Sequence, residues 1–181
     1  MKCSKSATWL LFSLLSACST PNSRIDRLYT ELRSDAAEHP TGSRPDPKLD
    51  ERHASRAAEV REIIAKDGVK DRATRLHAAV LLAETTNPDD LALAEKIARQ
   101  VGLDGDKLGF RVAAEAVDKQ LVLRRLPQRY GTQYEWVPVL GEWRLYPIDA
   151  TTTDDDRRAM EVAPLVELYD GEKKMNAGRR K

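Results

Sequence analysis

The sequence predicts a mainly α-helical protein that ends in an aromatic β-hairpin and a short helix. Up to about residue 125, apolar residues recur every three or four positions, as in amphipathic helices. Several of these segments follow a capping residue such as aspartate or asparagine. From Gln128, β-branched and aromatic residues alternate with polar ones, as in strands. We expect about five helices in an irregular bundle, with an array of stacked helical hairpins as the alternative.

The first helix is expected from Ser23 to about Glu38, with Ser23 and Asp26 as a capping box. Its apolar residues form one narrow face, made of Ile25, Leu28, Tyr29 and Leu32. Residues 39–47 contain three prolines and one glycine, so we expect a loop there.

Three further helices are expected after the N-capping residues Asp46, Asp71 and Asn87. Proline directly follows the first and the last of these, and proline is favoured in the first turn of a helix. The predicted ends of the three helices are Asp67–Gly68, the Thr85–Pro88 turn and Gly102.

The fifth helix is expected to begin at Asp104 or Asp106 and to run to about Arg125. Its apolar residues occupy two faces. One face is Leu108, Val112, Ala116 and Leu123, and the other is Phe110, Ala113, Val117 and Leu121. A helix that is apolar on more than one side is usually enclosed by others, so we expect this one to be the central helix.

Residues 128–149 are expected to form a β-hairpin, with strands within Thr132–Val139 and Trp143–Ile148. Pro138 and Pro147 cannot donate hydrogen bonds between strands, so the strands should be short and should pack against the helices for stability.

A capped short helix is expected after the hairpin, because Thr153 precedes three aspartates. It should end near Met160. The basic segment 169–181 is expected to be a flexible tail.

The N-terminal segment resembles a bacterial lipoprotein signal. A basic start is followed by an apolar core at residues 7–15 and by Leu15-Ser16-Ala17-Cys18, which has the form leucine, two small residues and cysteine. The resemblance implies cleavage before Cys18 and lipidation of its thiol, with palmitate among the acyl chains. The alternatives are an ordinary secretory signal cleaved near Ala17 or an uncleaved anchor.

This organisation gives a signal peptide at 1–17, a lipidated tether at 18–22 and a single helix-rich domain at 23–168. Loss of Lys2 and Lys5 changes the net charge from +1 to −1, which offers no electrostatic footprint for nucleic acid. No cysteine remains for a metal site or for catalysis, and we expect no cofactor.

The predicted location is the cell envelope, with the lipid on Cys18 as the contact to the membrane. Ser19 follows the cysteine. In Gram-negative lipoproteins a residue other than aspartate at this position usually implies the outer membrane, so we expect the protein to face the periplasm there.

Two internal segments resemble an uncharacterised family of bacterial proteins. Ala113–Leu121 is an alanine-rich helix with Asp118 near its end, and Pro127–Gln133 is Pro-Gln-Arg-Tyr-Gly-Thr-Gln. Asp154 and Arg157 resemble the family's later Asp-x-x-Arg pair. The resemblance covers roughly residues 50 to 168 and implies no activity.

The sequence departs from that family in two places. Lys119 stands where arginine is usual, and Ala83-Glu84-Thr85 stands where members often have Gln-His-Gly. If the family's histidine is catalytic, this chain lacks it.

The predicted binding surface is the Pro127–Gln133 motif with the aromatic residues that follow it. Outside the signal, five of the eight aromatic residues lie between 130 and 146, and such clusters stack on sugar rings or anchor protein partners. The candidate binding residues are Gln128, Arg129, Tyr130, Gln133, Tyr134, Trp136 and Trp143. The alternative is a purely structural role, in which these residues form a buried turn and the core of the hairpin.

Glu115 and Asp118 are the candidate catalytic residues. They are three positions apart on a helix, so they share a face, and a partly buried carboxylate pair can separate its pKa values for acid–base catalysis. Ordinary pairing with Arg111, Lys119 or Arg129 is the alternative. The three histidines have no metal-ligand spacing, so we expect no metal site.

Two functional hypotheses follow. The first is a lipid-anchored binding or scaffold module of the cell envelope that contacts a protein or glycan partner. The second is an envelope hydrolase that uses the carboxylates of Glu115 and Asp118. A purely structural role is the third alternative, because a fold class does not imply a function.

Overall fold

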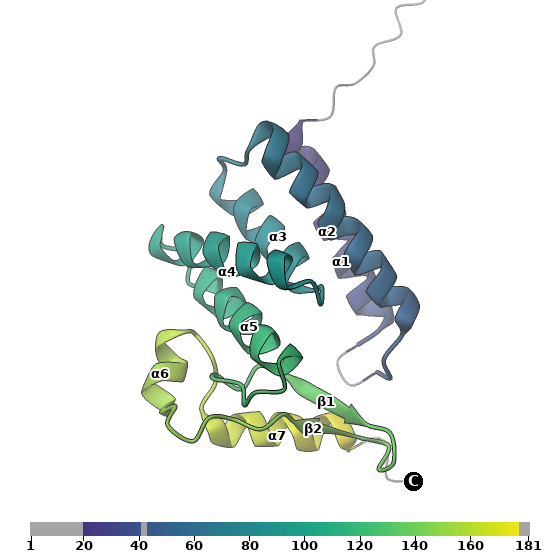
Figure 1. The fold of residues 1–181 in the computed structure, drawn as a ribbon, viewed down its shortest axis with the longest axis vertical. Helices are drawn as coiled ribbons and strands as arrows, with labels where there is room; N and C mark the ends of the chain where they lie inside the picture. The colour runs from purple at the N-terminus through teal and green to yellow at the C-terminus, as the bar shows by residue number, and fades with distance from the viewer. Residues whose placement is uncertain (1–19, 41–42, 178–181) are drawn as a thin grey trace, which may run out of the picture.

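The computed structural model describes residues 20–40 and 43–177. In this part of the chain, five packed helices precede a two-stranded antiparallel sheet and two C-terminal helices (Figure 1). The expected fold class is thereby confirmed. The elements are α1 (Pro21–Glu38), α2 (Pro47–Asp67), α3 (Arg72–Ala83), α4 (Pro88–Leu103), α5 (Leu108–Leu123), β1 (Tyr134–Val137), β2 (Glu142–Leu145), α6 (Asp154–Ala159) and α7 (Leu165–Asn176). The signal-like segment and Cys18 lie outside the described residues.

Most of the predicted N-caps are confirmed by hydrogen bonds to the first turn of their helices. These caps are Asp46, Asp71, Asn87 and Thr153. The helix predicted to end near Glu38 is confirmed as α1, but its predicted capping box was wrong, because Thr20 is the cap and accepts a hydrogen bond from the amide of Ser23 at 3.2 Å. The helix starts earlier than expected since Pro21 suits a first turn.

The central helix is α3 rather than α5. It packs against α1, α2, α4 and α5, and Ala78, Ala79 and Leu82 are completely buried in it. The expectation for α5 was wrong because this helix packs mainly against α4 and less extensively against α3, and Leu108 and Leu123 of its expected apolar face are exposed.

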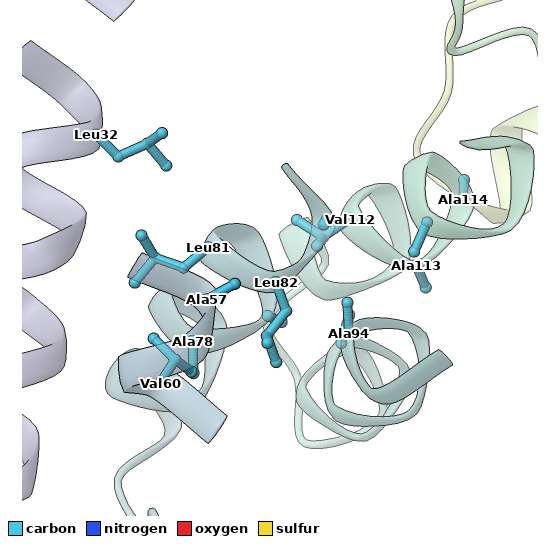
Figure 2. Packing of buried hydrophobic residues seen from close by; sticks show 14 of the residues in the cluster. Leu32, Ala57, Val60, Ala78, Leu81, Leu82, Ala94, Val112, Ala113 and Ala114 are labelled. Atoms are coloured by element: carbon cyan, nitrogen blue, oxygen red, sulfur yellow. The ribbon is translucent and has the colours of Figure 1, made fainter. Parts of the chain in front are cut away.

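Small side chains allow the helices to approach closely. Figure 2 shows buried residues of α1 to α5 gathered in one cluster, many of them alanines. The tightest approach joins α4 to α5 at Gly109, where an added Cβ would collide with the carbonyl oxygen of Ala98 and the amide nitrogen of Gly102. Only glycine fits at this crossing.

The predicted hairpin is confirmed, with strands of four residues each. Trp136 of β1 lies opposite Trp143 of β2. The strands are shorter than the segments marked out by the sequence, because Pro138 and Pro147 fall outside them, as residues without an amide hydrogen do.

The expected flexible tail is largely helical, so this prediction was wrong up to Asn176, where α7 ends. The side chain of Asn176 accepts a hydrogen bond from the amide of Trp143 at 2.9 Å and donates one to its carbonyl at 2.8 Å. Glu172 accepts another from the amide of Leu145 at 2.7 Å. These contacts bind α7 to β2 (Figure 1). The basic composition of the C-terminal segment does not indicate them.

Candidate functional site

The Pro127–Gln133 loop is organised around the carboxylate of Asp118, which is completely buried. One oxygen, Oδ1, accepts hydrogen bonds from the amides of Arg129 at 2.7 Å and Tyr130 at 2.9 Å. The other oxygen, Oδ2, accepts from the amides of Gly131 and Thr132 and from the Thr132 hydroxyl, each at 2.9 Å. Five donors from four consecutive residues therefore surround one carboxylate, which offsets the cost of burying its charge.

The side chain of Gln128 fastens the same loop to the hairpin. It is completely buried, and its Nε2 donates to the carbonyls of Gln133 at 2.9 Å and Tyr146 at 2.8 Å. Its Oε1 accepts from the amide of Gln133 at 2.8 Å. The whole amide group is therefore engaged within the protein, as buried polar groups usually are.

Arg157 of α6 closes the other side of the loop. Its guanidinium donates to the carbonyls of Tyr130 at 3.2 Å and Thr152 at 3.1 Å, and it pairs with Asp154 at 3.1 Å. Gly131, beside Tyr130, has a φ of +94°, and an added Cβ there would lie 2.5 Å from a methyl group of Leu168. The loop thus needs a glycine at this position.

These contacts decide which residues of the predicted binding surface can reach a partner. Gln128 and Tyr130 are buried, and the loop is held by the side chain of Gln128 and by the backbone of Tyr130. Arg129 is exposed, with its guanidinium 5.4 Å from the centre of the Tyr130 ring. Gln133 is half-buried, and its Nε2 donates to Thr132 Oγ1 at 3.0 Å.

The aromatic residues of the hairpin are half-buried. Trp136 and Trp143 meet edge to face across the strands, with ring centres 5.7 Å apart. The Tyr134 hydroxyl donates to the carbonyl of Leu168 at 3.0 Å, and burial raises the pKa of Tyr134. The hairpin therefore carries part of each ring to the surface while α7 restrains it.

The two candidate catalytic carboxylates have separate partners. Glu115 pairs with Arg111 at 2.9 Å, and its side chain is 38% exposed. Burial raises the pKa of Glu115, and the Arg111 guanidinium partly opposes this effect. Both oxygens of Asp118 are engaged with the loop backbone, so Asp118 cannot exchange protons with a substrate without losing the loop's support.

A polar hollow that the sequence did not indicate lies between the end of α3 and the middle of α5. It has a volume of about 190 Å³. Its lining residues are Val80, Ala83, Glu84, Glu115, Lys119, Thr132 and Gln133. It brings Glu84 of the Ala83–Thr85 stretch beside the Pro127–Gln133 motif, although these segments are far apart in the sequence.

The ionisable groups around this hollow are perturbed. Burial lowers the pKa of Lys119, whereas the nearby carboxylates of Glu84, Asp50 and Glu115 oppose that effect. Burial also lowers the pKa of His53 on α2, and Glu84 again opposes it. Perturbed groups of this kind gather at functional sites. The periodicity of the sequence could not have identified this group of ionisable residues, because they lie on three different elements.

Within residues 20–40 and 43–177, no three His, Asp or Glu side chains are grouped closely enough to hold a metal ion. No helix in the same ranges has both the length and the apolar composition needed to cross a bilayer.

Comparison of the chain with protein-family models, curated proteins and solved structures found no match.

Proposed function

We propose that this protein is a lipid-anchored binding or scaffold module of the bacterial cell envelope. The lipid on Cys18 holds it to the membrane, which is the outer membrane, facing the periplasm, in a Gram-negative cell. It contacts a protein or glycan partner through the hairpin surface, which we define as Tyr134, Trp136, Val139, Leu140 and Trp143.

The observation that supports this proposal is the apolar tip of the hairpin. Val139 is 95% exposed and Leu140 is 56% exposed in the turn between the strands, next to the half-buried rings of Trp136 and Trp143. Exposed apolar groups beside aromatic rings are typical of contact sites.

The hairpin surface is also held in a defined position. The Tyr134 hydroxyl and the backbone of Trp143 are bound to α7, and Gln128 ties the base of the hairpin to the loop. A surface that is already ordered loses less conformational entropy when a partner binds. Gln128 therefore supports the contact surface from inside, whereas Arg129 is exposed on the loop beside Asp149 and Asp156.

The proposal is tested by photo-crosslinking in living cells. A benzophenone amino acid at Val139 of the full-length, lipidated protein should capture one discrete protein or glycan partner on irradiation. Tyr134 is the poorer position, because its hydroxyl holds α7. The matched control is the same amino acid at Ala92, an exposed position of α4.

A discrete adduct from Val139 and none of the same size from Ala92 would support the contact surface. No adduct from Val139, in a protein that is folded and anchored, would overturn it.

An envelope hydrolase is the second candidate, and it now depends on Glu115. This carboxylate lines the 190 Å³ hollow and has a raised pKa, as a general acid requires. The expected result is cleavage of cell-wall glycan or peptide fragments by the purified protein and its loss in Glu115→Gln. Absence of cleavage by the unaltered protein would remove this candidate.

A further inference from the structure

A second, larger hollow adjoins the polar one. It lies between α1, α2 and α3 and has a volume of about 350 Å³. Tyr29, Leu32 and Leu49 give it apolar walls, and Val80 and Glu84 line both hollows. The two together form a trough with a polar end and a mainly apolar end, which is the usual character of a small-molecule site.

His53 supplies an independent sign of a ligand in this trough. Its side chain lines the larger hollow and is 9% exposed. The imidazole makes no hydrogen bond with the described residues, and its nitrogens are not among the buried polar atoms closed off without a partner. The ring nitrogens are therefore open to the trough, and a neutral imidazole offers one donor and one acceptor to a molecule bound there.

The charges at the polar end are also incompletely paired. The carboxylate of Glu84 has no hydrogen bond or ion pair with the described residues. Lys119 Nζ donates to the carbonyl of Ala83 at 2.9 Å and has no ion pair with them. Glu115, by contrast, is already paired with Arg111. A carboxylate without a hydrogen bond to the described residues and an ammonium with a single one therefore face the same small hollow, close enough to influence each other's charge.

Each of these charges favours a ligand group of the opposite sign. The Glu84 carboxylate favours an ammonium group, and Lys119 favours a carboxylate, because opposite charges in a partly enclosed site attract more strongly than in water. A ligand with only one charge would leave the other protein charge without a partner. A ligand with both charges pairs with both.

We propose that this trough binds a small zwitterion with an apolar side chain, namely an amino acid or the end of a short peptide. The ligand's ammonium group lies at Glu84 and its carboxylate at Lys119. Its side chain occupies the hollow beside Tyr29 and Leu49, within reach of His53. None of the residues that line the trough belongs to the hairpin surface, so this proposal does not depend on the proposed function.

The test uses three ligands of nearly the same shape with the full-length, lipidated protein in detergent. L-leucine has both charges, leucinamide lacks the carboxylate, and 4-methylpentanoate lacks the amine. We expect L-leucine to bind at least about tenfold more tightly than either analogue in calorimetric titrations, since each analogue loses one charge-assisted hydrogen-bonded pair. In NMR spectra, L-leucine should shift the side-chain amide of Gln133 and the ring of His53.

Two variants assign the charges. Glu84→Gln should weaken L-leucine about tenfold and leave 4-methylpentanoate unchanged. Lys119→Met should weaken L-leucine and leave leucinamide unchanged. Glu62→Gln, an exposed carboxylate of α2 away from the trough, is the matched control and should leave L-leucine binding unaltered.

The proposal is overturned if L-leucine does not bind at millimolar concentration, or if either analogue binds as tightly as L-leucine. It is also overturned if Glu84→Gln folds normally, as its NMR spectrum reports, and keeps full affinity for L-leucine. The Glu84 side chain makes no hydrogen bond or ion pair with the described residues, so this variant separates ligand binding from folding.

Discussion

Asp118 and Lys119 are neighbours on α5, yet their charges have different roles. The Asp118 carboxylate accepts five hydrogen bonds inside the protein, whereas the Lys119 ammonium lines the polar hollow with only a carbonyl as its partner. A charge whose bonding capacity is filled by the backbone stabilises the fold, and one with free capacity is available to a ligand.

At the residue scale we expect Asp118→Asn to destabilise the protein by about 3 kcal/mol or more. An amide has a single oxygen, and its NH₂ group would face backbone donors of Gly131 and Thr132 or of Arg129 and Tyr130. Urea unfolding followed by circular dichroism measures the loss.

Glu115→Gln is the matched control for this prediction, because it removes a partly exposed ion pair and should cost less than about 1 kcal/mol. Equal stability of the two variants would show that the loop does not depend on Asp118.

The pH dependence of stability provides a second residue-scale prediction, centred on His53. Its pKa is lowered by burial from its ordinary value of 6.5, while Glu84 and Asp50 act to raise it and Lys119 and Arg56 to lower it further. Below pH 6.5 the unfolded chain binds a proton at this ring before the folded protein does. The contribution of His53 is therefore present above pH 6.5 and is lost as the pH falls below that value.

We expect His53→Gln to lose less stability than the unaltered protein between about pH 7 and about pH 5, measured by urea unfolding at each pH. Glu115, with a raised pKa, contributes a slope of the opposite sign, but it is the same in both proteins. Parallel stability curves for the two proteins would contradict the assignment to His53.

At the scale of elements, the closest contact is the crossing of α4 and α5. Gly109 meets backbone atoms of α4, whereas a Cβ at Gly102 would meet only the ring of Phe110, at 2.8 Å. A half-buried ring can rotate away, but a helix backbone cannot move without disturbing its neighbours.

We therefore expect Gly109→Ala to cost about 1–3 kcal/mol of stability, as overpacking usually does. Gly102→Ala should cost clearly less, because the higher helix propensity of alanine offsets part of the strain. Thermal unfolding of the two variants measures this order. The reverse order would mean that the two helices can separate easily at Gly109.

The hairpin and α7 stabilise each other. A hairpin with strands of four residues is marginal alone, and α7 supplies partners for the amides of Trp143 and Leu145. The helix in turn gains those hydrogen bonds, so neither element depends on its own sequence alone.

At the scale of the whole molecule, the Pro127–Gln133 loop joins the five-helix bundle to the C-terminal elements β1, β2, α6 and α7. Asp118 on α5 and Arg157 on α6 both bind its backbone. The proposed contact surface is on the hairpin that follows this loop, whereas the proposed trough lies among the helices and reaches the loop at Thr132 and Gln133.

The proposed lipid anchor leads to a whole-molecule prediction. The net charge of the mature chain is close to zero, so attachment to membranes should resist high salt and should depend on acylation. We expect Cys18→Ser to lose metabolically incorporated palmitate and the mature, faster-migrating form.

Cys3→Ser is the matched control and should be processed and sedimented with membranes like the unaltered protein. Labelled, membrane-bound and fully processed Cys18→Ser protein would contradict the anchor.

The sequence by itself determined the helices and most of their caps, because capping and periodicity depend on residues a few positions apart. Asp46, Asp71 and Asn87 could each be assigned from their immediate neighbours. The hairpin was predictable for the same reason, and the Pro127–Gln133 motif was recognisable as a unit.

Only the tertiary structure decided what these residues do. It engaged Asp118 and Gln128 in hydrogen bonds to a distant loop and strand, made α3 the central helix and ordered α7 on the hairpin. It also brought His53, Glu84 and Lys119 to one trough from three different helices and loops. Such contacts join residues 13 or more positions apart. No local pattern in a sequence records which distant backbone group or charge a side chain will meet.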